Sequence, residues 1–229
     1  MTGQALSGRK IVVLGGTGGL GHAVTARFRD DGASVLAFDA RIPAAEHRQD
    51  GVSYVAVDAL DETSVAAAFA EVPHAAAVVN LIGGYTPPQP LSGLDVSVLR
   101  QQLELNLVTA AIVTKHAMPV LAAQDGGALV HVSSRVAAEK GENGFAYSVS
   151  KLGVVRLVEA AAAEGRDQGV RVNCIMPSII DTPANRAAMP GATHHRWPKP
   201  AQLAAVLAFL VSDDAILISG AAIPVYGQA

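Results

Sequence analysis

The chain alternates short apolar runs with longer stretches that are rich in alanine and leucine. The short runs, in which β-branched residues are common, predict seven strands, at residues 10–14, 34–39, 52–57, 75–80, 128–132, 170–175 and 221–225. The longer stretches predict five helices, at residues 19–31, 62–71, 95–121, 146–168 and 201–210. Strands that are almost wholly apolar are typical of a parallel sheet covered by helices on both faces. The pattern therefore predicts an α/β fold of right-handed βαβ units.

Composition narrows the class of protein further. Half of the 229 residues are hydrophobic and 16% are charged, so we expect residues 1–229 to form one folded α/β domain. A net charge of −3 predicts no general attraction to nucleic acid or to an anionic membrane. No uninterrupted apolar run approaches the roughly 20 residues that span a bilayer. The single Cys174 excludes an internal disulfide and, with no signal-type segment at the start, predicts a cytoplasmic protein.

A glycine-rich turn joins the first predicted strand to the first predicted helix and reads Gly15-Gly16-Thr17-Gly18-Gly19-Leu20-Gly21. Backbone N–H groups in such a turn, with the positive end of the helix, form a site for a pyrophosphate, and the absence of Cβ atoms allows close approach. The glycines fit the spacings G-x-G-x-x-G, G-x-x-G-x-x-G and G-x-x-x-G-x-G, and spacing alone does not choose among them. A dinucleotide is therefore the expected cofactor.

Two carboxylates follow the next two predicted strands. Asp39 is placed to accept hydrogen bonds from the adenosine ribose hydroxyls, and its charge would repel a 2′-phosphate, which favours NAD(H). Arg41 favours NADP(H) instead, because a guanidinium neutralises such a phosphate, so the sequence leaves both cofactors open. A turn cap is the alternative role for Asp39. For Asp58 a turn cap is as well supported as a hydrogen bond to the adenine amino group.

Tyr147 and Lys151 are four residues apart in a long predicted helix, so their side chains share one face. An ammonium beside a phenol stabilises the phenolate and lowers its pKa from about 10. A tyrosine and a lysine four residues apart occur often by chance, but the neighbouring sequence strengthens the interpretation of this pair as catalytic. Ser134 follows the strand at residues 128–132 and so lies at the carboxyl edge of the sheet. Asn106, between two leucines, is expected to be a buried amide that acts as a structural bridge or in a proton path.

Together these motifs resemble the short-chain dehydrogenase/reductase family over essentially the whole chain. The resemblance implies a three-layer Rossmann fold with a doubly wound, seven-stranded parallel sheet. It implies a catalytic tetrad of Asn106, Ser134, Tyr147 and Lys151. The cofactor-binding residues expected on this basis are Gly15, Thr17, Gly18, Gly19, Leu20, Gly21, Asp39, Arg41, Asp58, Ala59, Asn80, Gly83, Tyr147, Lys151, Pro177, Ile180 and Thr182.

The resemblance also implies a role for each member of the tetrad. Tyr147 exchanges a proton with the substrate oxygen, and Ser134 donates a hydrogen bond to that oxygen. Lys151 lowers the pKa of Tyr147 and holds the nicotinamide ribose, while Asn106 fixes a water that links Lys151 to solvent. One departure from the family is that its usual Asn-Asn-Ala-Gly reads Asn80-Leu81-Ile82-Gly83 here.

These roles predict an NAD(H)-dependent oxidoreductase that interconverts a carbonyl and an alcohol on a small molecule. Three segments are expected to wall the pocket, at residues 84–90, 139–145 and 182–197. The expected substrate contacts are Tyr85, Ser134, Arg135, Phe145, Met189 and Trp197. No metal site is expected, because His194 and His195 are adjacent and no cysteine or carboxylate cluster joins them.

Two alternative functions remain open at this point. Residues 181–197 and Gly83-Gly84-Tyr85 are similar to dihydropteridine reductases, although those enzymes lack the catalytic serine that Ser134 provides here. A dinucleotide-sensing protein without turnover is the other alternative, but it does not need Tyr147 and Lys151 in register with a serine. Family resemblance further implies a homotetramer or homodimer that pairs the two longest helices.

Overall fold

A computed structural model describes residues 5–124, 126–139 and 144–228. Seven parallel strands form one sheet, in the order β3-β2-β1-β4-β5-β6-β7. The strands are β1 (Lys10–Leu14), β2 (Ser34–Asp39), β3 (Val52–Ala56), β4 (Ala77–Asn80), β5 (Gly127–Val132), β6 (Val170–Pro177) and β7 (Ala222–Val225). The helices are α1 (Gly19–Asp30), α2 (Glu62–Ala70), α3 (Val96–Leu103), α4 (Thr109–Ala122), α5 (Phe145–Gly165), α6 (Pro183–Ala188) and α7 (Pro200–Val211). The predicted doubly wound α/β fold is confirmed, with some element ends displaced by one to three residues.

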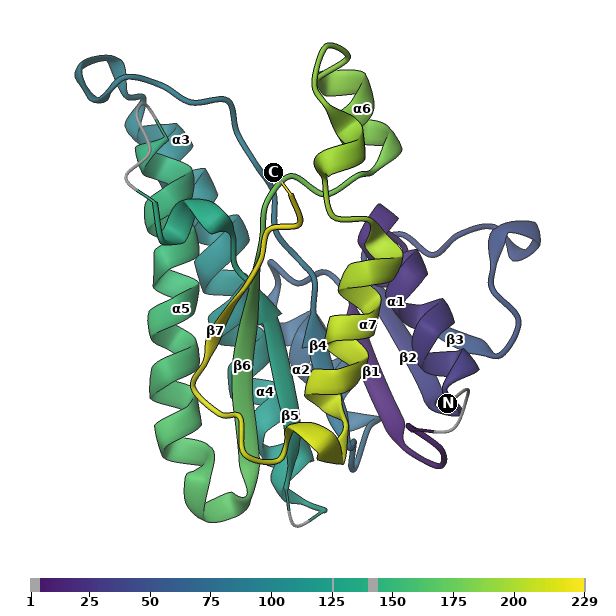
Figure 1. The fold of residues 1–229 in the computed structure, drawn as a ribbon. Helices are drawn as coiled ribbons and strands as arrows, with labels where there is room; N and C mark the ends of the chain where they lie inside the picture. Colours follow the sequence, from purple (N-terminus) through teal and green to yellow (C-terminus); the bar gives the residue numbers. More distant parts are fainter. Residues whose placement is uncertain (1–4, 125, 140–143, 229) are drawn as a thin grey trace.

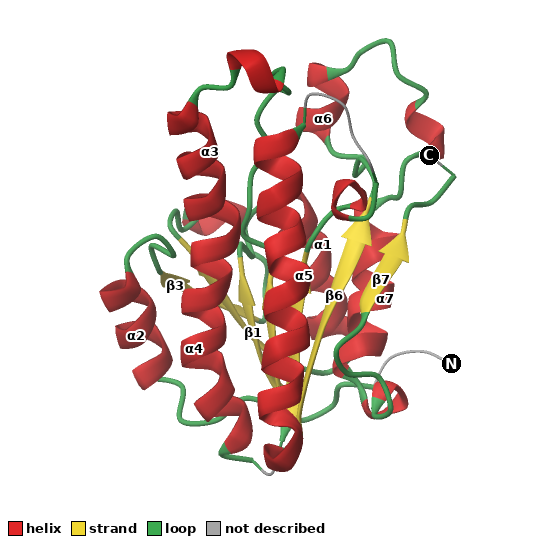
Figure 2. Cartoon of the chain, turned by 90° about the vertical axis from the view of Figure 1, so that its left-hand side faces the viewer, coloured by secondary structure: helices red, strands yellow, loops and turns green. Residues whose placement is uncertain are grey.

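The central strands of the sheet are buried on both faces because most of their residues are apolar. In β1, Ile11 and Val13 pack into the core under α1 and α7, where Phe28 and Leu207 meet them. The intervening Val12 and Leu14 belong to the opposite core, under α2, α4 and α5. Figure 2 shows these three helices side by side across the sheet. The alternation of the β1 side chains therefore produces the three layers.

The strand order reverses beside β1, and this reversal positions the functional groups. β1 pairs with β2 on one side and with β4 on the other, so the chain builds the sheet outward in two directions. In such sheets, ligands bind beyond the carboxyl ends of the strands at the point of reversal. The loop that follows β4 and the segment containing α6 both rise above this edge (Figure 1).

The sequence predicted one helix over residues 95–121, and the structure corrects this. α3 ends at Leu103, a π-helical turn spans Glu104–Val108, and α4 continues from Thr109. Such turns often occur at functional sites, and this one carries the buried Asn106. The whole stretch Val96–Ala122 is long and apolar enough to cross a membrane by length and composition alone. Here, however, the apolar side chains of α4 pack into the core under the sheet.

Candidate active site

The structure brings Ser134, Tyr147 and Lys151 together at the carboxyl edge of the sheet. Ser134 follows β5, and its hydroxyl forms a hydrogen bond with that of Tyr147 on α5. Lys151, one turn further along α5, is 4% exposed, and its Nζ donates to the Val132 carbonyl at 3.1 Å. The Ser133 hydroxyl donates to the Lys151 carbonyl at 2.7 Å, which ties α5 to the end of β5. The predicted serine, tyrosine and lysine thus share one site.

Asn106 reaches the same site from the π-helical turn. Its Nδ2 donates to the Gly84 carbonyl at 3.0 Å, and its Oδ1 accepts from the Gly84 N–H at 2.9 Å. Gln102 and Ser150, both buried, lie 3.1 Å from the same Nδ2. A Cβ on Gly83 would lie 2.7 Å from both Asn106 Oδ1 and Lys151 Nζ, so only glycine lets the chain pass between these groups. Asn106 therefore acts as a structural bridge that holds the loop after β4.

The electrostatics of the site differ from the expectation. Burial raises the pKa of Tyr147, the hydrogen bond from Ser134 lowers it in part, and the Tyr85 phenol raises it further. The pKa of Lys151 is lowered to about 8, chiefly by burial. The expectation that Lys151 lowers the pKa of Tyr147 is therefore not borne out, since Lys151 is not among the groups that shift this pKa. Loss of hydration is the largest cause of the raised pKa, because Tyr147 is held away from water.

The glycine turn after β1 has the shape of an anion cradle. Gly15 has a φ of +76°, which disfavours any other residue, and α1 begins at Gly19. A Cβ on Gly21 would lie 2.1 Å from the Gly15 carbonyl oxygen, and one on Gly19 would lie 3.2 Å from Thr182 Cγ2. Thr182, one of the expected cofactor-binding residues, thus approaches the turn directly. These bare backbone positions fit a pyrophosphate, as the nucleotide loop of a Rossmann fold requires.

Asp39 is held against this turn. Its Oδ2 accepts from the Thr17 hydroxyl at 2.7 Å and from the Thr17 N–H at 3.1 Å, and its Oδ1 accepts from the Arg41 N–H at 3.3 Å. The Arg41 residue itself is exposed. Asp58 caps a turn, because its Oδ1 accepts from the Leu60 N–H at 2.9 Å, and Ala59 is buried in the core. The Asp58 carboxylate thus makes the hydrogen bond of a turn cap, and the residue is exposed.

A cleft of about 690 Å³ opens above the tetrad. Its walls come from α1, the loop after β4, the segment after β5, α5 and the segment that includes α6. The lining residues are Leu20, Leu81, Gly83, Gly84, Tyr85, Val132, Ser133, Ser134, Arg135, Val136, Glu139, Tyr147, Lys151, Pro177, Ser178, Ile179, Ile180, Asn185 and Met189. Apolar atoms form most of the cleft surface, although nine of these residues, Ser134 and Tyr147 among them, carry a polar group. The lining includes four of the six predicted substrate contacts, with Ser134, Arg135 and Met189 among them.

Three predicted site residues lie elsewhere. Trp197 is buried and packs against the His194 ring, with the centroids 4.7 Å apart, so it supports the fold rather than the cleft. Phe145 is exposed at the start of α5 and is not part of the cleft lining. The Asn80 side chain is inside the sheet, where it contacts His131 and the Ile82 N–H. Of the predicted wall at 139–145, residues 140–143 lie outside the described part of the chain.

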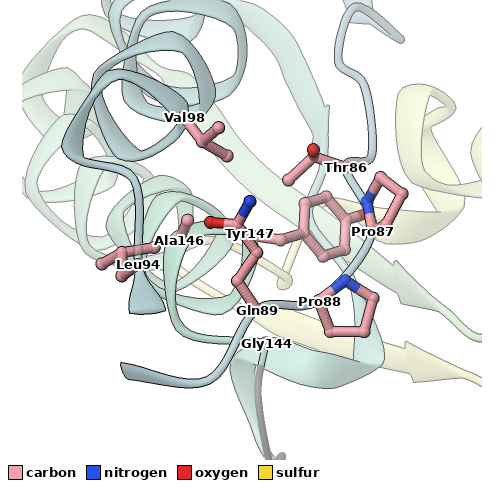
Figure 3. Close-up of a pocket in the computed structure, with 9 residues that line it drawn as sticks. All are labelled: Thr86, Pro87, Pro88, Gln89, Leu94, Val98, Gly144, Ala146 and Tyr147. Atoms are coloured by element: carbon pink, nitrogen blue, oxygen red, sulfur yellow. The ribbon is translucent and has the colours of Figure 1, made fainter. Parts of the chain in front are cut away.

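Tyr147 has a second enclosed side, formed by the loop after β4. The ring of Tyr85 meets the ring of Tyr147 edge to face, with centroids 5.2 Å apart. Residues 86–89 then pass along the start of α5, and Pro87 lies beside the Tyr147 ring (Figure 3). Leu94 and Val98 complete this side. The Tyr147 phenol is therefore enclosed by an aromatic ring and a proline ring on this side, which accounts for its loss of hydration.

Sequence reasoning missed a buried histidine behind the site. His131 in β5 is 1% exposed; its Nδ1 lies 3.2 Å from Asn80 Nδ2, and its Nε2 lies 3.0 Å from the Thr114 hydroxyl. The Thr114 hydroxyl already donates to the Ala110 carbonyl, so it accepts from His131, which is thus the neutral Nε2–H tautomer. Burial lowers the pKa of His131 to about 3. Within the described residues, no group of three histidine, cysteine or carboxylate side chains is arranged to hold a metal ion.

Comparisons with known proteins agree with this geometry. The family model described as short chain dehydrogenase matches residues 9–192. A cis-4-hydroxycyclohexanecarboxylate dehydrogenase from Sinomonas cyclohexanicum is 34% identical over 98% of both chains, and an L-fucose dehydrogenase from Mus musculus is 31% identical over 97% of this chain and 91% of its own. A solved short-chain type dehydrogenase/reductase from Mycobacterium ulcerans superposes with a TM-score of 0.88 at 28% identity, covering 97% of this chain and 90% of its own. The chain therefore belongs to the short-chain dehydrogenase/reductase family, whose members are NAD(P)-dependent oxidoreductases of alcohols and carbonyls.

Proposed function

We propose that this protein is an NAD(H)-dependent dehydrogenase that interconverts a secondary alcohol and a ketone, with Tyr147 as the general acid and base. The observation that carries the proposal is the hydrogen bond between Ser134 and Tyr147 at the base of a largely apolar cleft. Two hydroxyls that converge there form a binding site for a single substrate oxygen. The buried Lys151 ammonium lies behind them, 5.9 Å from the centroid of the Tyr147 ring.

Each side chain has one task in this scheme. Ser134 orients the substrate oxygen, and Tyr147 removes the hydroxyl proton during oxidation or returns it during reduction. Lys151 holds positive charge near the phenolate that oxidation requires, and Asn106 fixes the loop that closes the site. The nicotinamide, when bound, supplies the hydride exchange with the substrate carbon. Because burial raises the pKa of Tyr147, its phenol is protonated at neutral pH, so we expect oxidation to accelerate with rising pH and reduction to slow.

The preference for NAD(H) rests on Asp39. Its carboxylate is positioned by two hydrogen bonds from Thr17 and lies at the end of β2, where the adenosine ribose is expected. A fixed negative charge at this point accepts hydrogen bonds from ribose hydroxyls and repels a 2′-phosphate. The Arg41 backbone N–H also donates to this carboxylate at 3.3 Å, and the Arg41 residue is exposed.

The apolar lining favours an alicyclic alcohol over a sugar. Leu81, Val136, Ile179, Ile180 and Met189 offer hydrocarbon contact, while a sugar needs a hydrogen-bond partner for every hydroxyl. Among the similar proteins, the cis-4-hydroxycyclohexanecarboxylate dehydrogenase fits this cleft better than L-fucose dehydrogenase does. A hydroxylated cyclohexane is therefore the substrate class that we propose.

The test is NAD⁺ and NADP⁺ reduction by purified protein with cis-4-hydroxycyclohexanecarboxylate, cyclohexanol and L-fucose. We expect turnover with NAD⁺ on the cyclohexane alcohols, a loss of at least about 10³-fold in Tyr147→Phe, and wild-type activity in Tyr54→Phe. Tyr54 is a suitable control because its hydroxyl contacts the Gln49 N–H in the β3 region. NADH binding without turnover on alcohols, ketones or quinonoid dihydropterin would contradict the proposal.

A further inference from the structure

Tyr85 is a large aromatic residue that remains mostly exposed beside Tyr147. It belongs to the loop after β4, is 65% exposed and lines the cleft. Its ring meets the Tyr147 ring with the centroids 5.2 Å apart and the ring planes at 89° to each other. Aromatic pairs favour this edge-to-face arrangement, which stabilises them beyond the surface that they bury. The contact therefore favours one orientation of the Tyr85 ring, although most of the surface of that residue is in water.

The backbone on both sides of Tyr85 is held in place. Gly84, the residue before it, exchanges two hydrogen bonds with the Asn106 side chain, at 2.9 Å and 3.0 Å. After it come Pro87-Pro88, whose rings restrict the φ angles of the backbone. These two prolines lie along the second enclosed side of Tyr147 (Figure 3). The segment that carries the Tyr85 ring is thus fixed before and after it.

The Tyr147 ring has one contact at its tip and another along its body. At the tip, its hydroxyl forms a hydrogen bond with that of Ser134, and this contact alone lets the ring turn about the hydroxyl. Along the body, the ring meets Tyr85. The two contacts together restrict the ring more than either does alone. Such placement matters for proton transfer, because a displacement of about 1 Å in a reacting group can lower a rate by roughly 10²-fold.

We propose that Tyr85 is a positioning residue, which holds the Tyr147 ring in the orientation in which its hydroxyl meets Ser134 and the substrate oxygen. The inference rests on the proposed function and adds to it a residue that acts through Tyr147. The Tyr85 hydroxyl has an effect of its own. Burial is the largest cause of the raised pKa of Tyr147, and the Tyr85 phenol raises this pKa further. The ring of Tyr85 therefore affects the orientation of Tyr147, and its hydroxyl affects the loss of the Tyr147 proton.

A residue that only forms the cleft wall predicts a different result from a positioning residue. If Tyr85 only contacts the substrate, its removal raises KM, and more so for a large alcohol than for a small one. If Tyr85 positions Tyr147, its removal slows the chemical step on every alcohol and changes the pH dependence of that step. The other titratable side chains in the described cleft lining are Arg135, Glu139 and Lys151. Tyr85 variants leave all three in place, so a changed pH dependence reports on Tyr85.

The experiment measures single-turnover NADH formation from cyclohexanol and from propan-2-ol across neutral and alkaline pH. Tyr85→Leu should lower the rate at the alkaline plateau about tenfold on both alcohols, with KM changed less than about twofold. Tyr85→Phe keeps the ring and should retain at least about half of the plateau rate. In both variants the midpoint of the pH profile should move to lower pH, because each lacks the phenol that raises the pKa of Tyr147. The matched control is Phe209→Leu, which replaces an exposed aromatic residue on α7 outside the cleft lining and should leave the profile unchanged.

The outcomes separate the positioning role from the proposed function. A KM raised only for cyclohexanol, with an unchanged plateau rate in Tyr85→Leu, would assign Tyr85 to the cleft wall and refute the positioning role. If Tyr85→Leu does not fold, Tyr85→Phe decides, because an unmoved midpoint would refute the influence of Tyr85 on Tyr147. An absence of turnover by wild type on every alcohol would refute the proposed function. The ultraviolet titration of the Tyr147 phenolate, with Tyr147→Phe as the blank, then tests the contact alone, and an unmoved midpoint in Tyr85→Leu would refute it.

Discussion

Replacing the buried Lys151 by methionine should make the protein more stable and inactive. Lys151 is 4% exposed and its ammonium has one protein partner, the Val132 carbonyl at 3.1 Å, among the described hydrogen bonds. Methionine has a similar length and no charge, so it fits the same space without the cost of burying an ammonium.

The size of the gain follows from the pKa of Lys151. Burial lowers this pKa from 10.5 to about 8, which corresponds to about 3 kcal/mol at neutral pH. Loss of the hydrogen bond to the Val132 carbonyl costs about 1 kcal/mol in return. A net gain of about 2 kcal/mol should raise Tm by roughly 4–8 °C in a chain of this size.

The gain should also depend on pH in a defined direction. Between pH 8 and 10.5 the unfolded wild-type chain holds the Lys151 proton while the folded chain releases it, so wild-type stability rises with pH across this window. The difference between Lys151→Met and wild type should therefore be largest below pH 8 and close toward pH 10.5. Urea unfolding of both proteins across this range measures it, without cofactor.

The control is Lys115→Met, which removes an ammonium whose side chain is 67% exposed and should change stability by less than about 0.5 kcal/mol. A Lys151→Met protein that is no more stable than wild type at pH 7 would show that burial of the Lys151 ammonium does not lower the free energy of unfolding. A stability difference that stays constant to pH 10.5 would refute the titration argument even if the variant is more stable.

Four other variants test the nucleotide turn and the sheet. Gly21→Ala places a Cβ 2.1 Å from a backbone oxygen and should cost about 3 kcal/mol, whereas Gly18→Ala, with its nearest atom at 3.5 Å, should be neutral in urea unfolding. Asp39→Ser should lower the ratio of the NADPH to the NADH dissociation constant at least about tenfold in fluorescence titrations, and an unchanged ratio would remove Asp39 from nucleotide choice. His131→Leu leaves the Asn80 amide without its acceptor and should cost about 2 kcal/mol at pH 7. Because the pKa of His131 is lowered to about 3 in the folded protein, the unfolded chain binds the proton first as pH drops below 6.5. The free energy of unfolding of the wild type should therefore fall in this range, and His131→Leu should lack the part of this fall that is due to His131.

The repetitive parts of the fold could be predicted from the sequence because they obey local rules. A strand buried on both faces is apolar at nearly every position, and β1 is recognisable because the four residues that follow Lys10 are all apolar and buried. The turn after it could be placed from its glycines, since close backbone approach demands them. α6 was not predicted, because a helix of six residues has too little periodicity, although Thr182 at its N-cap and Pro183 at its first position are ordinary helix-start signals.

The tetrad could be predicted as a set of residues but not as an electrostatic system. Spacing along one helix shows that Tyr147 and Lys151 share a face, yet it says nothing of how much water each retains. The packing of Tyr85 and Pro87 around Tyr147 comes from a loop some sixty residues away in the chain, and this packing determines the direction of the pKa shift. Trp197 was misplaced for the same reason, because an aromatic side chain lines a cavity or fills a core according to contacts that its own segment does not encode.

The departures from ordinary folding rules gather at one place in the molecule. A buried ammonium at Lys151, a π-helical turn at Asn106 and a glycine at Gly83 with no room for a Cβ each cost stability on their own. They are also mutually dependent, since Asn106 Oδ1 and Lys151 Nζ each lie 2.7 Å from the position that a Cβ on Gly83 would take. A fold under selection for stability alone would replace each of them with an apolar or regular alternative. Their convergence around Tyr147 is therefore best explained by the reaction that we propose for the site. The extra stability expected of Lys151→Met measures the free energy of unfolding that the fold gives up to keep a buried ammonium there.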